Sequence, residues 1–155
     1  MASTTPHTIL LYRNGSKEGY RLSAEADEAL TPGELVRFDA DEELEPHGDS
    51  GAVQHRMFVL ENPYDDTNTS AAIDSDYATG DTAFYFYAVP GDLVYGWLKA
   101  GETVVKGVTM LQSDGAGALE AVTVAAGTLV MAVVGVADED LTAGVARARL
   151  RVRVL

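Results

Sequence analysis

The sequence of 155 residues contains no cysteine. Disulfide bonds, thiolate metal sites and a cysteine nucleophile are therefore excluded, and stability must come from packing, hydrogen bonds and oligomerisation. Long hydrophobic runs are missing as well. The longest apolar run, residues 129–137, contains Gly135 and is far shorter than the roughly 20 residues that span a bilayer. The N-terminus lacks the charged and apolar regions of a secretory signal, so we expect a soluble protein made in the cytoplasm, with no membrane contact.

Lysine is almost absent. Only Lys17, Lys99 and Lys106 occur, and the 11 Lys and Arg residues face 24 Asp and Glu, which gives a formal net charge of −13. An acidic, lysine-poor surface suits multimolar salt, where the Debye length falls to about 3 Å and self-repulsion is screened. We interpret this as adaptation to a salt-loving host, with an ordinary acidic protein as the alternative. Nucleic-acid binding is not expected, because it needs a clustered basic surface.

Recognisable catalytic and metal-binding motifs are missing too. The patterns GxSxG, GxGxxG and GxxxxGK[ST] do not occur, and the histidines, His7, His47 and His55, form no HxH or HExxH pattern. The Asp-rich loops do not fit the twelve-residue calcium loop, and no nucleophile–base pair is visible. We therefore expect no enzymatic activity, no catalytic residue, no metal and no cofactor, and we interpret the clustered carboxylates as a solvated surface.

What the sequence does contain is a series of short apolar segments separated by turn residues. Their spacing predicts an all-β fold: a single compact β-barrel or sandwich-like domain over residues 8–155, with a short N-terminal arm at 1–7 and at most one or two short helical turns. Strands are expected at 8–13, 34–39, 56–61, 83–89, 93–98, 103–105, 108–112, 119–124, 128–136 and 145–155.

Several connecting segments carry their own signals. Residues 23–30 predict one or two helical turns, with Ser23 as the N-cap. Asn14-Gly15 and residues 31–33 predict turns, and residues 113–117 predict a hairpin loop. Residues 41–51, 62–77 and 138–144 are expected to be loops. The continuously apolar residues 128–136 predict a central strand that is buried on both faces.

The last predicted strand alternates strictly between two kinds of residue. Arg147, Arg149, Arg151 and Arg153 fall on one face, and the positions between them are apolar. We call these four residues the arginine stripe. Two interpretations stay open: the arginines pair with acidic residues of the next strand, or they contact a neighbouring subunit or an acidic partner, since arginine is favoured at interfaces.

A set of segments in a fixed order carries a family resemblance. The segments are 29–36, 57–62, 73–74, 77–81, VPGDLVYGWL at 89–98, 100–102, 105–107, Leu111, 114–115 and RLRVRV at 149–154. Through them the sequence resembles the head-decoration (capsid cement) proteins of tailed phages and related haloarchaeal tailed viruses. The acidic residues 41–49 and the polar residues 62–76 depart from the pattern, which concerns surface contacts more than the fold.

The resemblance implies a β-barrel protein without catalysis or cofactor. Such a protein binds the outer capsid surface in the virion and stabilises the head against internal DNA pressure. The implied partners are the major capsid protein and further copies of the chain, most often as a trimer. The candidate contacts are the arginine stripe and the N-terminal arm, which would add a strand to an exposed sheet edge. A frayed terminus is the alternative interpretation of the arm. The arm comprises Met1, Ala2, Ser3, Thr4, Thr5, Pro6 and His7.

Two other functions stay open at this point. One is a different virion component, such as a fibre base or a tail protein. The other is a β-barrel that binds a small ligand or a carbohydrate. Its site would consist of the Asp-rich loops and of aromatic residues at 84–87, 95 and 97, although such residues more often belong to a core or an interface.

Overall fold

The computed structural model describes residues 6–13, 20–52, 55–64, 72–123 and 132–155. Within these ranges the chain is almost entirely β-structure, and its one helical element is a single 3-10 turn, η1, at Ala72–Asp74. The predicted all-β class with at most one or two helical turns is confirmed. In the part of the chain that the structure describes, no helix is long and apolar enough to cross a membrane.

The larger sheet closes into a barrel. Its order is β1 (Leu10–Tyr12), β7 (Leu93–Leu98), β10 (Leu119–Ala121), β9 (Met110–Ser113), β11 (Gly135–Ala137) and β13 (Ala148–Val154). Because β13 pairs with both β11 and β7, five strands form a closed ring, and β1 lies outside it on β7. The closing pair is long and antiparallel, running from Ala148 opposite Leu98 to Arg153 opposite Leu93.

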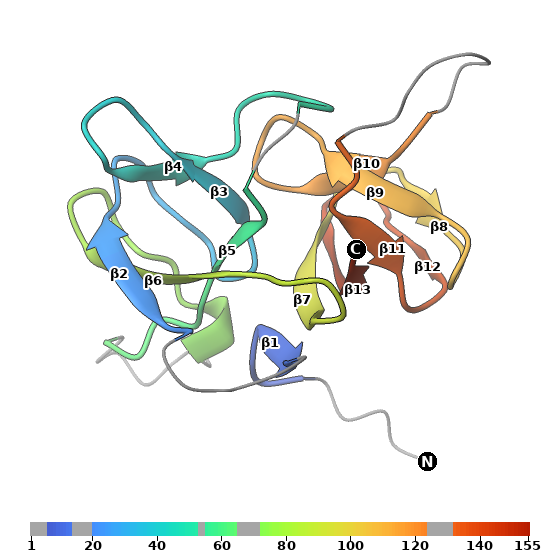
Figure 1. The fold of residues 1–155 in the computed structure, drawn as a ribbon, viewed down its shortest axis with the longest axis horizontal. Helices are drawn as coiled ribbons and strands as arrows, with labels where there is room; N and C mark the ends of the chain where they lie inside the picture. The colour runs from blue at the N-terminus through green and yellow to red at the C-terminus, as the bar shows by residue number, and fades with distance from the viewer. Residues whose placement is uncertain (1–5, 14–19, 53–54, 65–71, 124–131) are drawn as a thin grey trace.

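The second sheet is curled but closes at a single point. Its order is β2 (Leu22–Glu25), β6 (Thr82–Tyr87), β5 (Met57–Val59), β3 (Leu35–Phe38) and β4 (Leu44–Pro46). An isolated bridge between Ala26 and Leu44 brings its two outer strands together. A small two-stranded sheet pairs β8 (Thr103–Val104) with β12 (Leu141–Thr142). Figure 1 shows the curled sheet and the barrel side by side, as two lobes.

The two lobes share hydrophobic core. Strands β3, β5 and β6 are buried on both faces, because their residues alternate between two clusters. Leu35, Phe58 and Phe86 join the cluster that fills the barrel, whereas Val36 and Met57 join the cluster inside the curled sheet. The curled sheet thus packs one face on the barrel. The boundary predicted between the arm and a single domain stays a prediction, because residues 1–5 lie outside the described part.

Most predicted strands are confirmed, but the helical turns predicted at residues 23–30 are wrong. That segment begins with β2, in which Leu22 lies opposite Tyr85 and Glu25 opposite Thr82. Ala24 and Ala26 turn inward at a period of two and pack in the curled-sheet cluster. A segment this short gains little from helical hydrogen bonds alone, so pairing with β6 decides its structure.

Two predicted loops each contain a short strand. Residues 41–51 include β4, and residues 138–144 include β12. Their polar sequences hide the pairing, because these strands bury few side chains. The predicted 113–117 hairpin loop is confirmed, since β9 and β10 pair antiparallel around it. The turn at Asn14-Gly15 and residues 124–131 lie outside the described part. Of the predicted 128–136 strand, residues 132–136 are described, and only Gly135 and Val136 belong to a strand, β11, which lies between β9 and β13.

Candidate contact surfaces

The predicted N-terminal arm leads into the molecule through β1. Met1 to Thr5 lie outside the described residues, Pro6 is half-buried and His7 is exposed. The first anchored residue is Ile9, which is fully buried, accepts a hydrogen bond on its carbonyl from Tyr95 N–H at 2.7 Å and donates its own N–H to the Glu61 carboxylate. The role of Met1 to His7 as a capsid contact stays a prediction. Of this segment the structure describes only Pro6 and His7, which precede β1 in the chain.

The arginine stripe lies on the outer face of β13, as its alternation predicts. The apolar positions between the arginines face the barrel, and Leu150 and Val152 are fully buried. Three of the four arginine side chains are between 36% and 39% exposed, namely Arg147, Arg151 and Arg153. The stripe is therefore partly open to solvent but is covered along its length by neighbouring groups.

Arg147 and Arg149 enclose the indole of Trp97. Their guanidinium carbons lie 4.6 and 4.3 Å from the ring centroid, a distance at which a cation is attracted to the ring face. Arg149 lies directly opposite Trp97 in the β13–β7 pairing. The Trp97 Nε1–H and the Arg149 guanidinium both donate to the Pro32 carbonyl, at 3.0 and 2.9 Å. Because Pro32 precedes β3, this cluster fastens the barrel to the curled sheet.

A buried carboxylate completes the same junction. Glu34 is only 5% exposed, and its carboxylate accepts hydrogen bonds from the Arg147 guanidinium and, at 2.8 Å, from Thr31 N–H. Burial raises the pKa of Glu34 above its ordinary value, although both hydrogen bonds act in the opposite direction. Gly33 in this turn has φ +92°, and a Cβ there would lie 2.8 Å from the Tyr95 carbonyl. The predicted turn at 31–33 is thus confirmed, and it packs directly against β7.

The charges of Arg151 and Arg153 are paired with acidic residues of the segment that follows β11. Arg153 forms an ion pair with Asp138 at 3.7 Å and donates to the Gly91 carbonyl at 3.1 Å. The Arg151 backbone N–H donates to Glu139 at 2.8 Å, and the Arg151 guanidinium lies 4.0 Å from the same carboxylate. All four arginines therefore pair with acidic residues of the same chain.

This pairing supports the first interpretation of the stripe, with one change. The acidic partners come from connecting segments rather than from a neighbouring strand: Glu34 precedes β3, Asp74 ends η1, and Asp138 and Glu139 follow β11. A role of Arg147, Arg149, Arg151 and Arg153 in binding a subunit or a capsid stays a prediction. An acidic partner would have to displace these intramolecular pairs.

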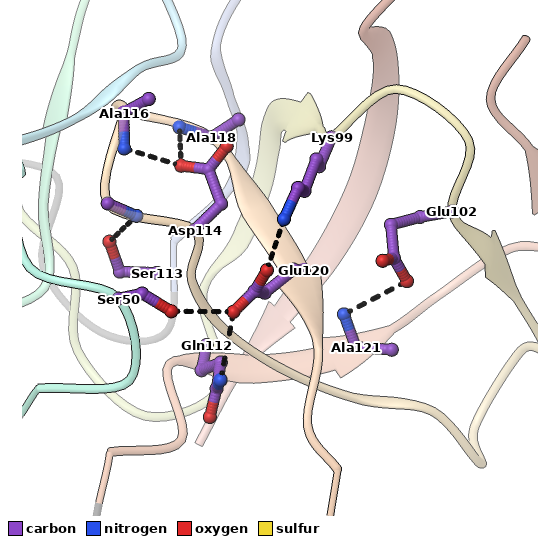
Figure 2. Close-up of polar contacts among 11 residues, drawn as sticks. Ser50, Lys99, Glu102, Gln112, Ser113, Asp114, Ala116, Ala118, Glu120 and Ala121 are labelled. Atoms are coloured by element: carbon purple, nitrogen blue, oxygen red, sulfur yellow. Dashed lines mark hydrogen bonds and ion pairs between the residues drawn. The ribbon is translucent and has the colours of Figure 1, made fainter.

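A second polar junction lies at the β9–β10 hairpin. Figure 2 shows the Glu120 carboxylate between three side chains, and it accepts hydrogen bonds from Ser50 Oγ at 2.7 Å, Gln112 Nε2 at 3.1 Å and Lys99 Nζ at 2.7 Å. Burial acts to raise the pKa of Glu120, but these hydrogen bonds outweigh it and hold the pKa below its ordinary value. Ser50 follows β4, so the network links the curled sheet to the barrel.

His47 makes the buried contact at this junction. It is 3% exposed, and its Nδ1 lies 2.8 Å from Oγ of Ser113, which is fully buried. Burial lowers the pKa of His47 below its ordinary value of 6.5, and the nearby charge of Arg37 lowers it further, while Asp49 and Asp114 act in the opposite direction. His47 is therefore neutral in the folded protein at neutral pH.

Clustered carboxylates occur where the sequence has its acidic loops. Asp27, Asp39 and Glu43 place carboxylate oxygens within 4.8 Å of one another, and so do Asp27, Glu28 and Glu45. Desolvation raises the pKa of Glu43 above its ordinary value, and repulsion from neighbouring carboxylates, Asp39 and Asp27 among them, adds to the shift. These residues are exposed or half-buried, which fits the prediction of a solvated acidic surface.

The sequence-based reasoning missed Trp97, Glu34 and His47 as contact residues. A signal for Trp97 was present: residues 93, 95 and 97 alternate on β7 in step with the stripe on β13, so the two sets share one face. For Glu34 and His47 there was none. Their partners, Arg147 and Ser113, lie 113 and 66 residues away in the chain.

The fold matches that of a phage head protein. A solved structure of the head fiber gp8.5 N base of bacteriophage phi29 superimposes with a TM-score of 0.53 and 14% sequence identity, and the match covers 87% of this chain and 92% of that chain. No protein-family model and no curated protein matches the sequence. At this identity the likeness establishes a shared fold over most of both chains.

Proposed function

We propose that the protein is a non-enzymatic structural component of a tailed-virus particle, bound to the outer surface of the head, where it cements the capsid against internal DNA pressure. The fold shared with a phage head fiber base over 87% of the chain carries this proposal. The sequence resemblance to head-decoration proteins points the same way independently. The interior of the barrel is filled by packed side chains, as suits a scaffold.

A head-fibre base is the second candidate. The structural neighbour is named as such a base, and the match spans 92% of it. A base and a cement protein would both bind the outside of the head, but only a cement protein must resist expansion of the capsid. The two roles therefore differ in what happens to the particle when the protein is removed.

The proposed partners are the major capsid protein and further copies of the chain, most simply as a trimer. Symmetric repetition multiplies modest contacts through avidity. The arm of residues 1–7 is the proposed strand donor to the capsid, and Arg151 and Arg153 are the stripe residues most available for a second contact, since they lie away from the Trp97 junction. The −13 charge favours assembly in high salt, where repulsion between copies is screened.

Virus particles made without this protein test the main proposal. For a cement protein, we expect them to release DNA on heating or on osmotic shock under conditions in which complete particles retain it, as measured by a dye that binds released DNA. Adding back the purified protein should restore retention. Particles that keep their DNA equally well but lose a surface projection would favour the fibre base and contradict cementing.

Deletion of residues 1–7 tests the arm. We expect the shortened protein to keep the melting temperature of the full chain, because the first fully buried residue in the described part is Ile9, and to lose most of its occupancy on capsids. The matched control is Val108→Ala, at a residue that is 70% exposed and lies outside both the arm and the stripe. Full occupancy after the deletion would exclude the arm as a capsid contact.

Light scattering in multimolar salt measures the oligomeric state of the purified protein. We expect a trimer, and a monomer would contradict it.

A further inference from the structure

The curled sheet has a hollow on the face that the barrel does not cover. It has a volume of about 460 Å³, within the roughly 300–1,000 Å³ typical of small-ligand sites. Its floor comes from β3 and β5, and one wall from β6. The curled sheet closes at the isolated bridge between Ala26 and Leu44, and neither of these residues lines the hollow.

A row of aromatic rings crosses this face. His55 stands against Tyr87 at 6.0 Å between ring centroids, Tyr87 against Tyr85 at 5.9 Å, and Tyr85 against Phe38 at 5.6 Å. Tyr87 is 40% exposed, so its ring is available to a ligand. Phe38 lines this hollow and also a neighbouring one of about 520 Å³. The aromatic surface therefore continues over a groove longer than one small ring.

Planar polar groups lie beside the rings. Arg37 lines the hollow, and its guanidinium donates to Glu45 at 2.6 Å and to Asp49. His47 also lines it and is 3% exposed. His47 Nδ1 is occupied by Ser113, and no other residue that the structure describes hydrogen-bonds its Nε2. The hollow thus combines exposed ring surface with hydrogen-bonding groups whose one guanidinium is already paired with two carboxylates.

We propose that this hollow, with the aromatic row as its wall, is a binding site for a neutral carbohydrate. A sugar ring has one face of C–H groups, which packs on aromatic rings, and an edge of hydroxyls, which both donate and accept hydrogen bonds. Phe38, His55 and Tyr87 supply the rings. Arg37, Asp49 and His47 supply donors and acceptors for the hydroxyls.

The charges of the site select a neutral ligand. Arg37 is already paired with two carboxylates, so no unpaired cation remains in the hollow to hold a carboxylate, sulfate or phosphate. The inference does not rest on the proposed virion role, and failure of either leaves the other standing.

Nuclear magnetic resonance on the isotopically labelled full chain tests the proposal. The probes are the methyl glycosides of glucose, mannose and galactose, and N-acetylglucosamine, with sialic acid as an anionic probe and indole as a purely aromatic one. We expect at least one neutral sugar to cause saturable shifts of the amides of Phe38, His55 and Tyr87. Sialic acid and indole should cause none there.

Three variants locate the site. Tyr87→Ala and His55→Ala should each weaken sugar binding by about tenfold, the loss expected for one packed ring. Tyr64→Ala is the control, because Tyr64 is 66% exposed, contacts an aromatic ring and lies outside the hollow. His55 is itself exposed, so its variant tests the proposal even if Tyr87→Ala fails to fold. The proposal is overturned if no neutral sugar saturates, if only indole or sialic acid binds, or if His55→Ala and Tyr64→Ala lose affinity equally.

Discussion

The barrel and the curled sheet are both small β-structures of five strands, yet they close in different ways. The barrel is a complete ring, in which β7 pairs with β13 along its whole length and with β10 at Leu98 opposite Leu119. The curled sheet closes through the single bridge between Ala26 and Leu44, and two hollows lie on this sheet. The barrel thus serves as a scaffold, and the curled sheet offers a shaped surface.

The junctions between the lobes differ in a similar way. One is the Trp97 cluster with the buried Glu34. The other, at the β9–β10 hairpin, consists of the hydrogen bonds of Glu120 (Figure 2) and the contact of His47 with Ser113. Between them lies the shared apolar core. The shared core predicts that the lobes fold as one cooperative unit despite their different closures.

The largest loss of stability is expected from a substitution in the hydrophobic core that the two lobes share. Phe58 is fully buried, stacks on Phe86 at 6.1 Å between centroids, and reaches the backbone of Gly96 in the barrel. Phe58→Ala should lower the free energy of unfolding by about 3–5 kcal/mol, because it leaves a cavity at the joint. Urea unfolding followed by the fluorescence of Trp97, the chain's single tryptophan, measures it.

A matched variant sharpens this test. Leu44 is fully buried but packs only in the curled-sheet cluster. If the lobes are one unit, Leu44→Ala should shift the unfolding transition seen by Trp97 in the barrel, by about 2–5 kcal/mol. The lobes would unfold separately if Leu44→Ala left the Trp97 fluorescence transition unchanged but shifted the unfolding transition measured by circular dichroism.

Substitutions in the arginine stripe should cost less stability, and the cost should differ between its residues. The Arg149 side chain is 9% exposed and donates to the carbonyls of Pro32 and Ile73. Arg149→Met should cost about 2–3 kcal/mol, because it removes the Ile73 carbonyl's donor and leaves the Pro32 carbonyl with the Trp97 Nε1–H alone. Arg151→Met, at a side chain 39% exposed, should change stability by less than about 1 kcal/mol. Equal losses of stability for Arg149→Met and Arg151→Met in thermal melts would contradict this difference between the two positions.

The smallest effect is expected on the pH dependence of the protein's stability. The folded protein holds the pKa of His47 below 6.5, so the unfolded chain takes up a proton at this residue first as the pH falls. Stability from neutral His47 is complete above about pH 6.5 and is lost as the pH falls from there through the folded pKa. We expect His47→Asn, which keeps a polar group near Ser113, to lose less stability than the wild type between about pH 8 and about pH 5. His55→Asn should follow the wild type, and identical slopes for all three would exclude His47 as the cause.

Sequence patterns predicted the β class, the strands with strong alternation and the turn at 31–33. They failed where pairing between segments that are distant in the sequence determines the structure. Residues 22–25 form β2 because β6 lies beside them, a fact that no local signal in Ser23 to Glu25 carries. The stripe was found from its period of two, but its acidic partners were not, because Glu34 reaches Arg147 only through the packing of two lobes. The division into two lobes was missed for the same reason.

Imaging of the virus particle by electron cryomicroscopy tests the central claim most directly. The account predicts density on the outer surface of the head into which the barrel and the curled sheet fit side by side, and the loss of that density from particles made without the protein. Density for this chain in the tail, inside the head, or nowhere on the particle would contradict the account.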